Sequence, residues 1–216
     1  EALVSLVLQW APNSVPRHIE TVESAQRLFD FIPQAVQRVY ATTATMPDTV
    51  TIGPLASGGA MAVYRLTIPN GGQTPYEFVC KIPHSRRLVY TSGTAEQSIE
   101  DSIRELLERL VQLADHLAQQ APGLFPRSGG SWHWHDAQGA AQHLFVEAFI
   151  PGLSLERVQL AYEEQFFSGI LSQTAYNQRR AAAQRLAMRT FIRLWDSLGR
   201  QMFPSDPSPW NILVHH

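Results

Sequence analysis

Apolar and polar residues alternate along two neighbouring stretches of the chain, residues 63–68 and 76–82. Period-two alternation is typical of strands with one buried face, and the Pro- and Gly-containing segment 69–75 between them has the composition of a turn. An apolar segment with glycines, residues 52–60, comes before this pair. The pattern predicts a three-stranded antiparallel start with a glycine-bearing loop between its first two strands.

A long helix is predicted next, because apolar residues recur there at steps of three and four. These residues are Ile99, Ile103, Leu106, Leu110, Leu113 and Leu117. Two more strands follow at residues 130–135 and 142–150, joined by a turn at 138–140. Within residues 132–135, Trp and His alternate, so we expect the tryptophans to point inward and the histidines outward. The alternative for that strand is a two-histidine metal site.

Helices are also predicted on either side of this region. One covers residues 22–40, where Pro33 is expected to kink or split it. The other covers residues 176–202, and its expected buried side consists of Leu186, Ile192, Leu194, Trp195 and Leu198. Three prolines keep residues 203–211 out of a helix, and residues 212–214 begin a strand.

The predicted elements divide the chain into three parts. Residues 1–48 form a helical lead-in, residues 49–150 are rich in strands, and residues 151–216 are largely helical. This arrangement predicts the α+β fold class.

Composition narrows the classes of protein that fit this organisation. The 216 residues are 44% hydrophobic with a net charge of −2, which suits a protein with a core and disfavours one that coats nucleic acid or an anionic membrane. The single cysteine, Cys80, excludes an internal disulfide and a multi-cysteine zinc site. No apolar run reaches the ~20 residues that a membrane-spanning helix needs. We therefore expect a cytoplasmic protein without a membrane or nucleic-acid partner, and the sequence indicates no oligomeric state.

Lys81 is the only lysine among the 17 lysine and arginine residues of the chain. Strand alternation predicts that Glu77, Val79 and Lys81 share one face. Val79 and Val63 can then cover a flat ring while the compact ammonium of Lys81 reaches phosphates beyond it. The alternative is a surface lysine on an edge strand.

Two short polar segments are further candidates. Backbone N–H groups of Ser57, Gly58 and Gly59 can approach phosphate oxygens closely, although a tight turn has the same composition. Asp206 and Asn211 lie in the proline-stiffened loop, where Asp206 can accept a proton and Asn211 can offer an amide oxygen to Mg²⁺. An Asx turn explains the same two residues.

Glu100 falls on the apolar side of the long helix, where an acid needs a partner. Lys81 is a candidate partner, and Glu96 and Glu105 are alternatives for Glu100 in that pair. An acid in a first helical turn also complements the helix dipole, and this second explanation stays open.

The order of these features resembles the protein-kinase-like fold and, within it, the aminoglycoside phosphotransferase and choline kinase branch. Residues 55–66 are similar to the nucleotide loop of that branch, and residues 78–81 resemble the strand with the phosphate-binding lysine. Residues 144–152 are similar to the hinge, where backbone groups hold adenine, and residues 205–214 resemble the catalytic loop. The resemblance covers about residues 49–214 and implies a β-rich N-lobe followed by a partial helical C-lobe.

The resemblance implies a role for each matching residue. Lys81 would bind the α- and β-phosphates of ATP and pair with Glu100, and the hinge residues Glu147 and Phe149 would belong to the nucleotide site. Asp206 would be the catalytic base and Asn211 a ligand of Mg²⁺.

Two departures from the family pattern accompany these matches. Pro204 stands two residues before Asp206, where the family usually has a hydrogen-bonding residue such as His. The Asp-Phe-Gly segment that holds metal in the family would follow Asn211 by one short hairpin, and the sequence ends at His216. We therefore expect the chain to be a piece of a longer protein.

These features predict an ATP- and Mg²⁺-dependent phosphotransferase that acts on a hydroxyl group of a small molecule. The first alternative is a pseudokinase that binds nucleotide or a partner without catalysis. The second is an interaction module in which residues 1–48 dock a partner.

Overall fold

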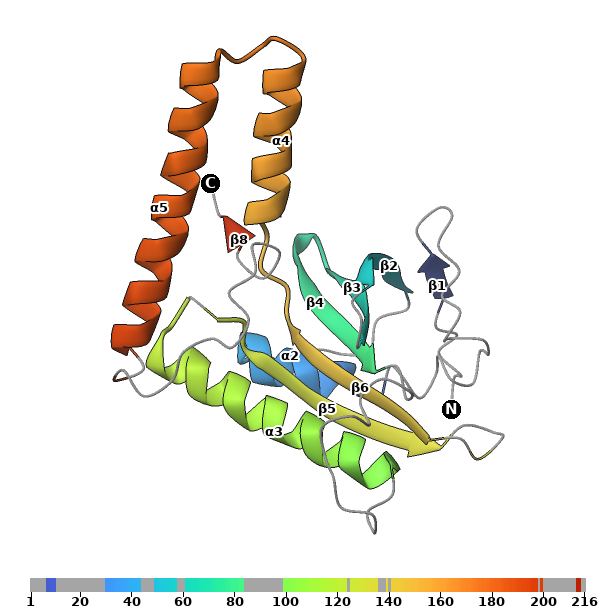
Figure 1. Ribbon diagram of the computed structural model, residues 1–216. Helices are drawn as coiled ribbons and strands as arrows, with labels where there is room; N and C mark the ends of the chain where they lie inside the picture. Colours follow the sequence, from blue (N-terminus) through green and yellow to red (C-terminus); the bar gives the residue numbers. More distant parts are fainter. Residues whose placement is uncertain are drawn as a thin grey trace. The chain divides into compact units, whose positions relative to one another are not determined.

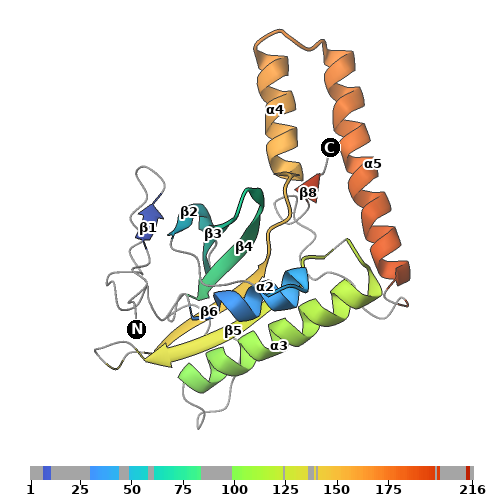
Figure 2. The ribbon, with the colours of Figure 1, turned by 180° about the vertical axis from the view of Figure 1, so that it is seen from behind.

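The computed structural model describes residues 7–10, 30–43, 49–57, 61–83, 99–123, 125–135, 139, 141–197, 199 and 213–214. The fold is α+β, as predicted (Figures 1 and 2). The chain divides into two compact units, which are described separately below. The first comprises residues 1–118 and 125–149, and the second comprises residues 119–124 and 150–216.

The first unit is built on a six-stranded sheet with the order β1-β2-β3-β4-β6-β5. Its strands are β1 (Val7–Trp10), β2 (Thr49–Ser57), β3 (Met61–Asn70), β4 (Gln73–Pro83), β5 (Ser128–His135) and β6 (Ala141–Ala148). β1 is parallel to β2, and every other neighbouring pair is antiparallel. The three-stranded start predicted from the sequence is confirmed as β2, β3 and β4.

The turn between β3 and β4 explains how this hairpin keeps its register. Gly71 and Gly72 lie between the paired residues Asn70 and Gln73 and have φ angles of 49° and 87°. Left-handed conformations at both central positions suit the right-handed twist of a two-residue hairpin, and glycine adopts them without steric cost.

One face of the sheet carries the main hydrophobic core. β3 alternates along its length, so Tyr64, Leu66 and Ile68 are buried while Arg65 is exposed. The same core receives Phe78 from β4 and Val146 from β6. Trp132 and Trp134 of β5 also pack against it, and His133 and His135 are exposed, which confirms the predicted alternation in that strand.

Helix α2 (Ile32–Tyr40) covers this face of the sheet and contributes its whole apolar side to the core (Figure 2). Five residues are buried there: Phe31, Ile32, Ala35, Val36 and Val39. Residues 30 and 31 form a turn, and Pro33 lies in the first turn of the helix, where its missing N–H costs nothing. Pro33 therefore starts α2 and does not kink it, and the alternative, that it splits a longer helix, stays a prediction. Residues 22–29 of the predicted helix lie outside the described residues.

Helix α3 (Ile99–Gln120) packs on the opposite face, and its position agrees with the predicted long helix. Ile103 and Leu107 are buried against Phe145 of β6, and Leu110 and Val111 pack beside them. Ile99 and Leu113 from the predicted stripe are exposed instead, because one sheet covers only a narrow side of a long helix.

The second unit contains a helical hairpin and a short two-stranded sheet. Helix α4 (Leu155–Phe167) begins at Ser154, whose side chain accepts a hydrogen bond from the Arg157 N–H at 3.2 Å. Helix α5 (Gln173–Ser197) lies alongside α4 (Figure 1). β7 (Leu153–Ser154) pairs with β8 (Leu213–Val214), so the predicted strand near residues 212–214 is present.

The predicted buried side of α5 is only partly right. Leu194 is buried, whereas Leu186, Ile192 and Trp195 are exposed. Leu198 lies outside the described residues. In the part of the chain that the structure describes, no helix combines the length and apolarity that crossing a membrane requires.

The burial of α2 predicts that this segment is needed for folding. Ile32 is 0% exposed and Ile99, also at the start of a helix, is 52% exposed. Ile32→Ala should lower the free energy of unfolding by about 2–5 kcal/mol, because the substitution leaves a cavity in the core. Ile99→Ala is the matched control and should change it by no more than about 0.5 kcal/mol. Chemical denaturation measures both, and equal effects would show that α2 is not part of the core.

Candidate functional site

Lys81 lies in the interior of the sheet, on the face opposite the main core. β4 pairs with β3 on one side and β6 on the other, so the alternative of an edge strand is wrong. In the register, Lys81 is opposite Val63 of β3 and Phe145 of β6. Val79 and Glu77 share its face, as alternation predicts. The ammonium therefore stands on a surface bordered by two valines and an aromatic ring.

The Lys81 ammonium pairs with the carboxylate of Glu147, with 2.5 Å between Nζ and Oε1. Glu147 is opposite Val79 in the β4–β6 register, so it lies diagonally across from Lys81 on the same face. The two side chains are 29% and 14% exposed, which leaves their attraction less screened than that of a surface pair. The ammonium is also 5.6 Å from the centre of the Phe145 ring, within the range of a cation–π interaction.

The predicted partner of Lys81 is different from the observed one. Glu100 pairs with His135 at 3.0 Å, Glu105 pairs with Arg109 on the same helix, and Glu96 lies outside the described residues. The prediction that Glu100 pairs with Lys81 is therefore wrong for this structure. Glu147 of the neighbouring strand β6 lies next to Lys81. The ammonium therefore has a carboxylate partner in the sheet and needs none from helix α3.

Helix α3 still takes part in the site through its contact with Phe145. Ile103 and Leu107 bury this ring, which is directly opposite Lys81 in the sheet. The packing fixes the apolar neighbour of the ammonium. It leaves the charged end of Lys81 facing Glu147.

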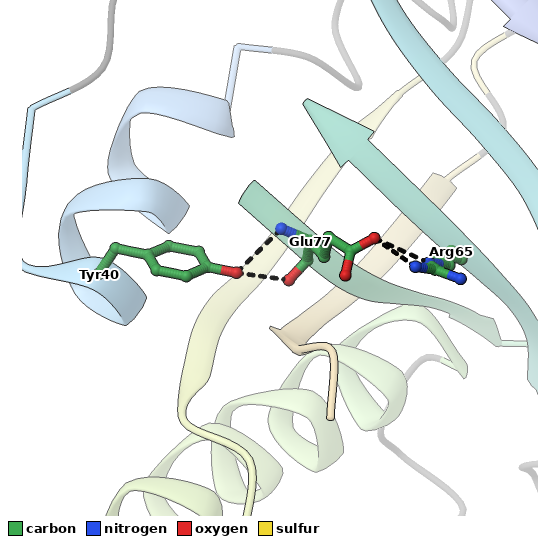
Figure 3. A network of polar contacts seen from close by, with 3 residues as sticks. All are labelled: Tyr40, Arg65 and Glu77. Atoms are coloured by element: carbon green, nitrogen blue, oxygen red, sulfur yellow. Dashed lines mark hydrogen bonds and ion pairs between the residues drawn. The ribbon is translucent and has the colours of Figure 1, made fainter. Parts of the chain in front are cut away.

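The same face continues toward the end of β6. Arg65 pairs with Glu77, with 3.1 Å between Arg65 Nε and Glu77 Oε1, and its guanidinium lies 4.1 Å from the centre of the Phe149 ring (Figure 3 shows the Arg65–Glu77 contact). Phe149 is one of the predicted hinge residues. The sequence did not indicate Arg65 as a site residue. Its role depends on its pairing with Glu77 of the next strand, which the local pattern does not show.

His143 is a buried polar residue that the sequence pattern did not single out. It is 6% exposed, and neither ring nitrogen has a hydrogen-bond partner among the described residues. Its ring lies 6.2 Å from that of His133, which is opposite it on β5. Burial lowers the pKa of His143, and His133 lowers it further, while the Glu100 carboxylate raises it by less. The ring is therefore neutral near pH 7.

Cys80 faces the main core beside Lys81, and burial raises the pKa of its thiol to about 12. Because the thiolate is the reactive form, this cysteine is not a nucleophile at neutral pH. Cys80 is thus a buried strand residue.

Other predicted site residues have no described geometry. Ser57 ends β2, while Gly58, Gly59, Asp206 and Asn211 lie outside the described residues. Among the residues that are described, no group of three or more His, Cys, Asp and Glu side chains has an arrangement that can hold a metal ion. The structure thus brings together Val63, Val79, Lys81, Glu147 and, farther along the face, Phe149, but not Glu100 with Lys81.

The chain was also compared with known proteins. No family model, no curated protein and no solved structure matches it.

The energy of the Lys81–Glu147 pair can be isolated by a double-mutant cycle. Lys81→Met, Glu147→Gln and the double variant should give a coupling of about 0.5–3 kcal/mol in the free energy of unfolding. The exposed pair Glu105–Arg109 is the control and should give about 0.3–0.5 kcal/mol, as i,i+4 surface pairs do. A Lys81–Glu147 coupling no larger than the control would contradict the geometry.

The neutral state of His143 makes stability depend on pH. Its folded-state pKa lies below the unfolded value, so the unfolded chain binds more protons below about pH 6.5 and stability falls as pH falls. The slope for one such group is at most about 1.4 kcal/mol per pH unit. His143→Leu should therefore lose less stability than the parent between pH 7.5 and 5.5, measured by denaturation at both values. An unchanged pH dependence in the variant would exclude this role for His143.

Proposed function

We propose that this chain binds ATP through the face of the sheet around Lys81 and belongs to an enzyme that transfers phosphate to a hydroxyl group of a small molecule. The observation that carries the proposal is the position of the only lysine in the chain, on an internal strand between Val63 and Phe145. A lysine at that position is poorly explained as a general surface cation.

The chemistry of this face fits the parts of a nucleotide. Val63 and Val79 offer apolar surface for a flat base, and the Lys81 ammonium offers a positive charge to phosphate oxygens. Glu147 neutralises that charge in the structure. The ammonium has three N–H donors, so a bound phosphate can share it with the Glu147 carboxylate.

The order of elements also supports the proposal. A hairpin, a strand with the lysine, a long helix and a further hairpin follow one another, and β6 of the last hairpin pairs with the lysine strand. This is the order in which the motifs similar to the aminoglycoside phosphotransferase and choline kinase branch occur along the chain.

Catalysis in this proposal depends on the loop that contains Asp206 and Asn211. Asp206 accepts the proton of the attacking hydroxyl, and the amide oxygen of Asn211 is a ligand suited to Mg²⁺. Mg²⁺ supplies charge stabilisation for phosphoryl transfer when it is bound.

Binding of Mg-ATP is the direct test of the proposal. Mg-ATP should raise the unfolding midpoint of the parent chain, and Lys81→Met should weaken its affinity by about 10- to 100-fold, because a charged hydrogen bond to phosphate is lost. Lys81→Arg should not restore binding fully, since the planar guanidinium differs in shape from the ammonium.

Arg109→Met is the matched control, because Arg109 is an exposed cation on α3 away from Lys81. It should bind Mg-ATP as the parent does. If the parent gains no stability from Mg-ATP, or if Lys81→Met gains as much as the parent, the proposed nucleotide site is wrong.

Nucleotide binding without catalysis is the second candidate, and Pro204 favours it. A proline two residues before Asp206 cannot donate the hydrogen bond that the family's usual residue makes there. Binding of Mg-ATP by the full chain without phosphate release or transfer to any hydroxyl acceptor would support this candidate over the enzyme.

A further inference from the structure

The last turn of helix α2 is hydrogen-bonded to Glu77 and Arg127, the two residues that flank the end of β6. The Tyr40 hydroxyl donates to the Glu77 carbonyl at 3.0 Å and accepts from the Glu77 N–H at 2.9 Å (Figure 3). One residue earlier in the helix, the Val39 carbonyl accepts from Arg127 Nη1 at 3.3 Å. Glu77 belongs to β4, and Arg127 immediately precedes β5.

The same two residues hold the chain where it leaves the sheet. The Ala148 N–H donates to the Arg127 carbonyl at 2.8 Å, and the Phe149 N–H donates to the Glu77 carbonyl at 3.0 Å. Phe149 is the last residue of the first unit. Helix α2 therefore contacts both residues whose carbonyls position residues 148 and 149: Glu77 through its backbone and Arg127 through its side chain.

Tyr40 also decides where the β4–β6 ladder stops. The register pairs Phe78 with Ala148, so a further rung would pair Glu77 with Phe149 and join the Glu77 N–H to the Phe149 carbonyl. The Glu77 N–H donates to the Tyr40 hydroxyl instead. The Phe149 carbonyl is thus replaced as the rung acceptor while the Phe149 N–H stays bonded to Glu77.

Arg65, which pairs with the side chain of Glu77, contacts Phe149 from the other direction. The Arg65 guanidinium lies 4.1 Å from the centre of the Phe149 ring. Tyr40 and Arg65 consequently act on the same residue: Tyr40 through the backbone of Glu77, and Arg65 by direct contact with the Phe149 ring. Burial raises the pKa of Tyr40, so its hydroxyl keeps the proton that it donates.

We propose that Tyr40 and Arg65 are positioning residues for recognition of a purine base: Tyr40 sets the backbone of Phe149 through Glu77, and Arg65 sets its ring. The inference rests on the proposed nucleotide site, in which residues 144–152 meet the base. The edge of a purine base carries hydrogen-bond donors, which need a backbone carbonyl that the sheet does not use. Tyr40 provides one, because its hydroxyl accepts the Glu77 N–H in place of the Phe149 carbonyl.

Two ligands that both carry phosphates, only one of which carries a base, distinguish an effect on base recognition from an effect on phosphate binding. Affinities of the full chain for Mg-ATP and for inorganic tripolyphosphate with Mg²⁺ are measured by calorimetry. Tyr40→Phe keeps the ring, which packs against Tyr76 and Phe78. It should weaken Mg-ATP binding by about 3- to 10-fold, the value of one hydrogen bond, and leave tripolyphosphate binding unchanged.

Arg65→Gln should show the same pattern, and it provides a second route to the test if Tyr40→Phe folds poorly. Tyr76→Phe is the control, because Tyr76 packs on the Tyr40 ring at 4.9 Å, and it should retain the affinities of the parent for both ligands. Amide exchange at Phe149 should be faster in Tyr40→Phe than in the parent.

The outcomes distinguish this inference from the proposed function. If the parent binds neither ligand, the nucleotide site and the positioning role both fall. If the parent binds Mg-ATP, and the Tyr40→Phe and Arg65→Gln variants either match it or lose both ligands equally, only the positioning role is overturned. A selective loss of Mg-ATP affinity in both variants establishes it.

Discussion

The pairing of β4 on both of its sides is the constraint on which the first unit depends. Alternation along this strand sends Phe78 and Cys80 into the main core and places Val79 and Lys81 on the opposite face. A slip of one residue would exchange the two faces and bury the Lys81 ammonium among apolar side chains, which is far more costly than any single contact. The register is therefore set by the same residues that form the candidate site.

Much of this architecture could be predicted from local pattern. Alternation identified the hairpin of β3 and β4, and the inward tryptophans of β5, because these features depend on neighbours along the chain. The Lys81–Glu147 pair could not be predicted, since it requires knowing that β6 pairs with β4 and in which register. The burial of His143 could not be predicted for the same reason, because it arises from the packing of distant segments.

Helix α2 shows how a segment outside the motifs that resemble the family can be necessary for folding. Residues 1–48 are expected from the sequence to be a separate lead-in, yet α2 supplies buried side chains to the same core as the sheet. Removing residues 1–48 would thus disturb folding, and such a truncation cannot separate partner docking from loss of the core. The hydrogen bonds of Tyr40 and Val39 add a second link, because they join α2 to the backbone of Glu77 and to the side chain of Arg127, next to the end of β6.

A chain with one lysine also carries one side-chain amine and one bond that a lysine-specific protease can cut, after residue 81. That bond lies near the end of β4, where Lys81 is paired on both sides, and a protease needs an extended, unpaired segment. Cleavage into residues 1–81 and 82–216 consequently requires the sheet to open. The rate of this single cut therefore measures how often the end of β4 separates from the neighbouring strands.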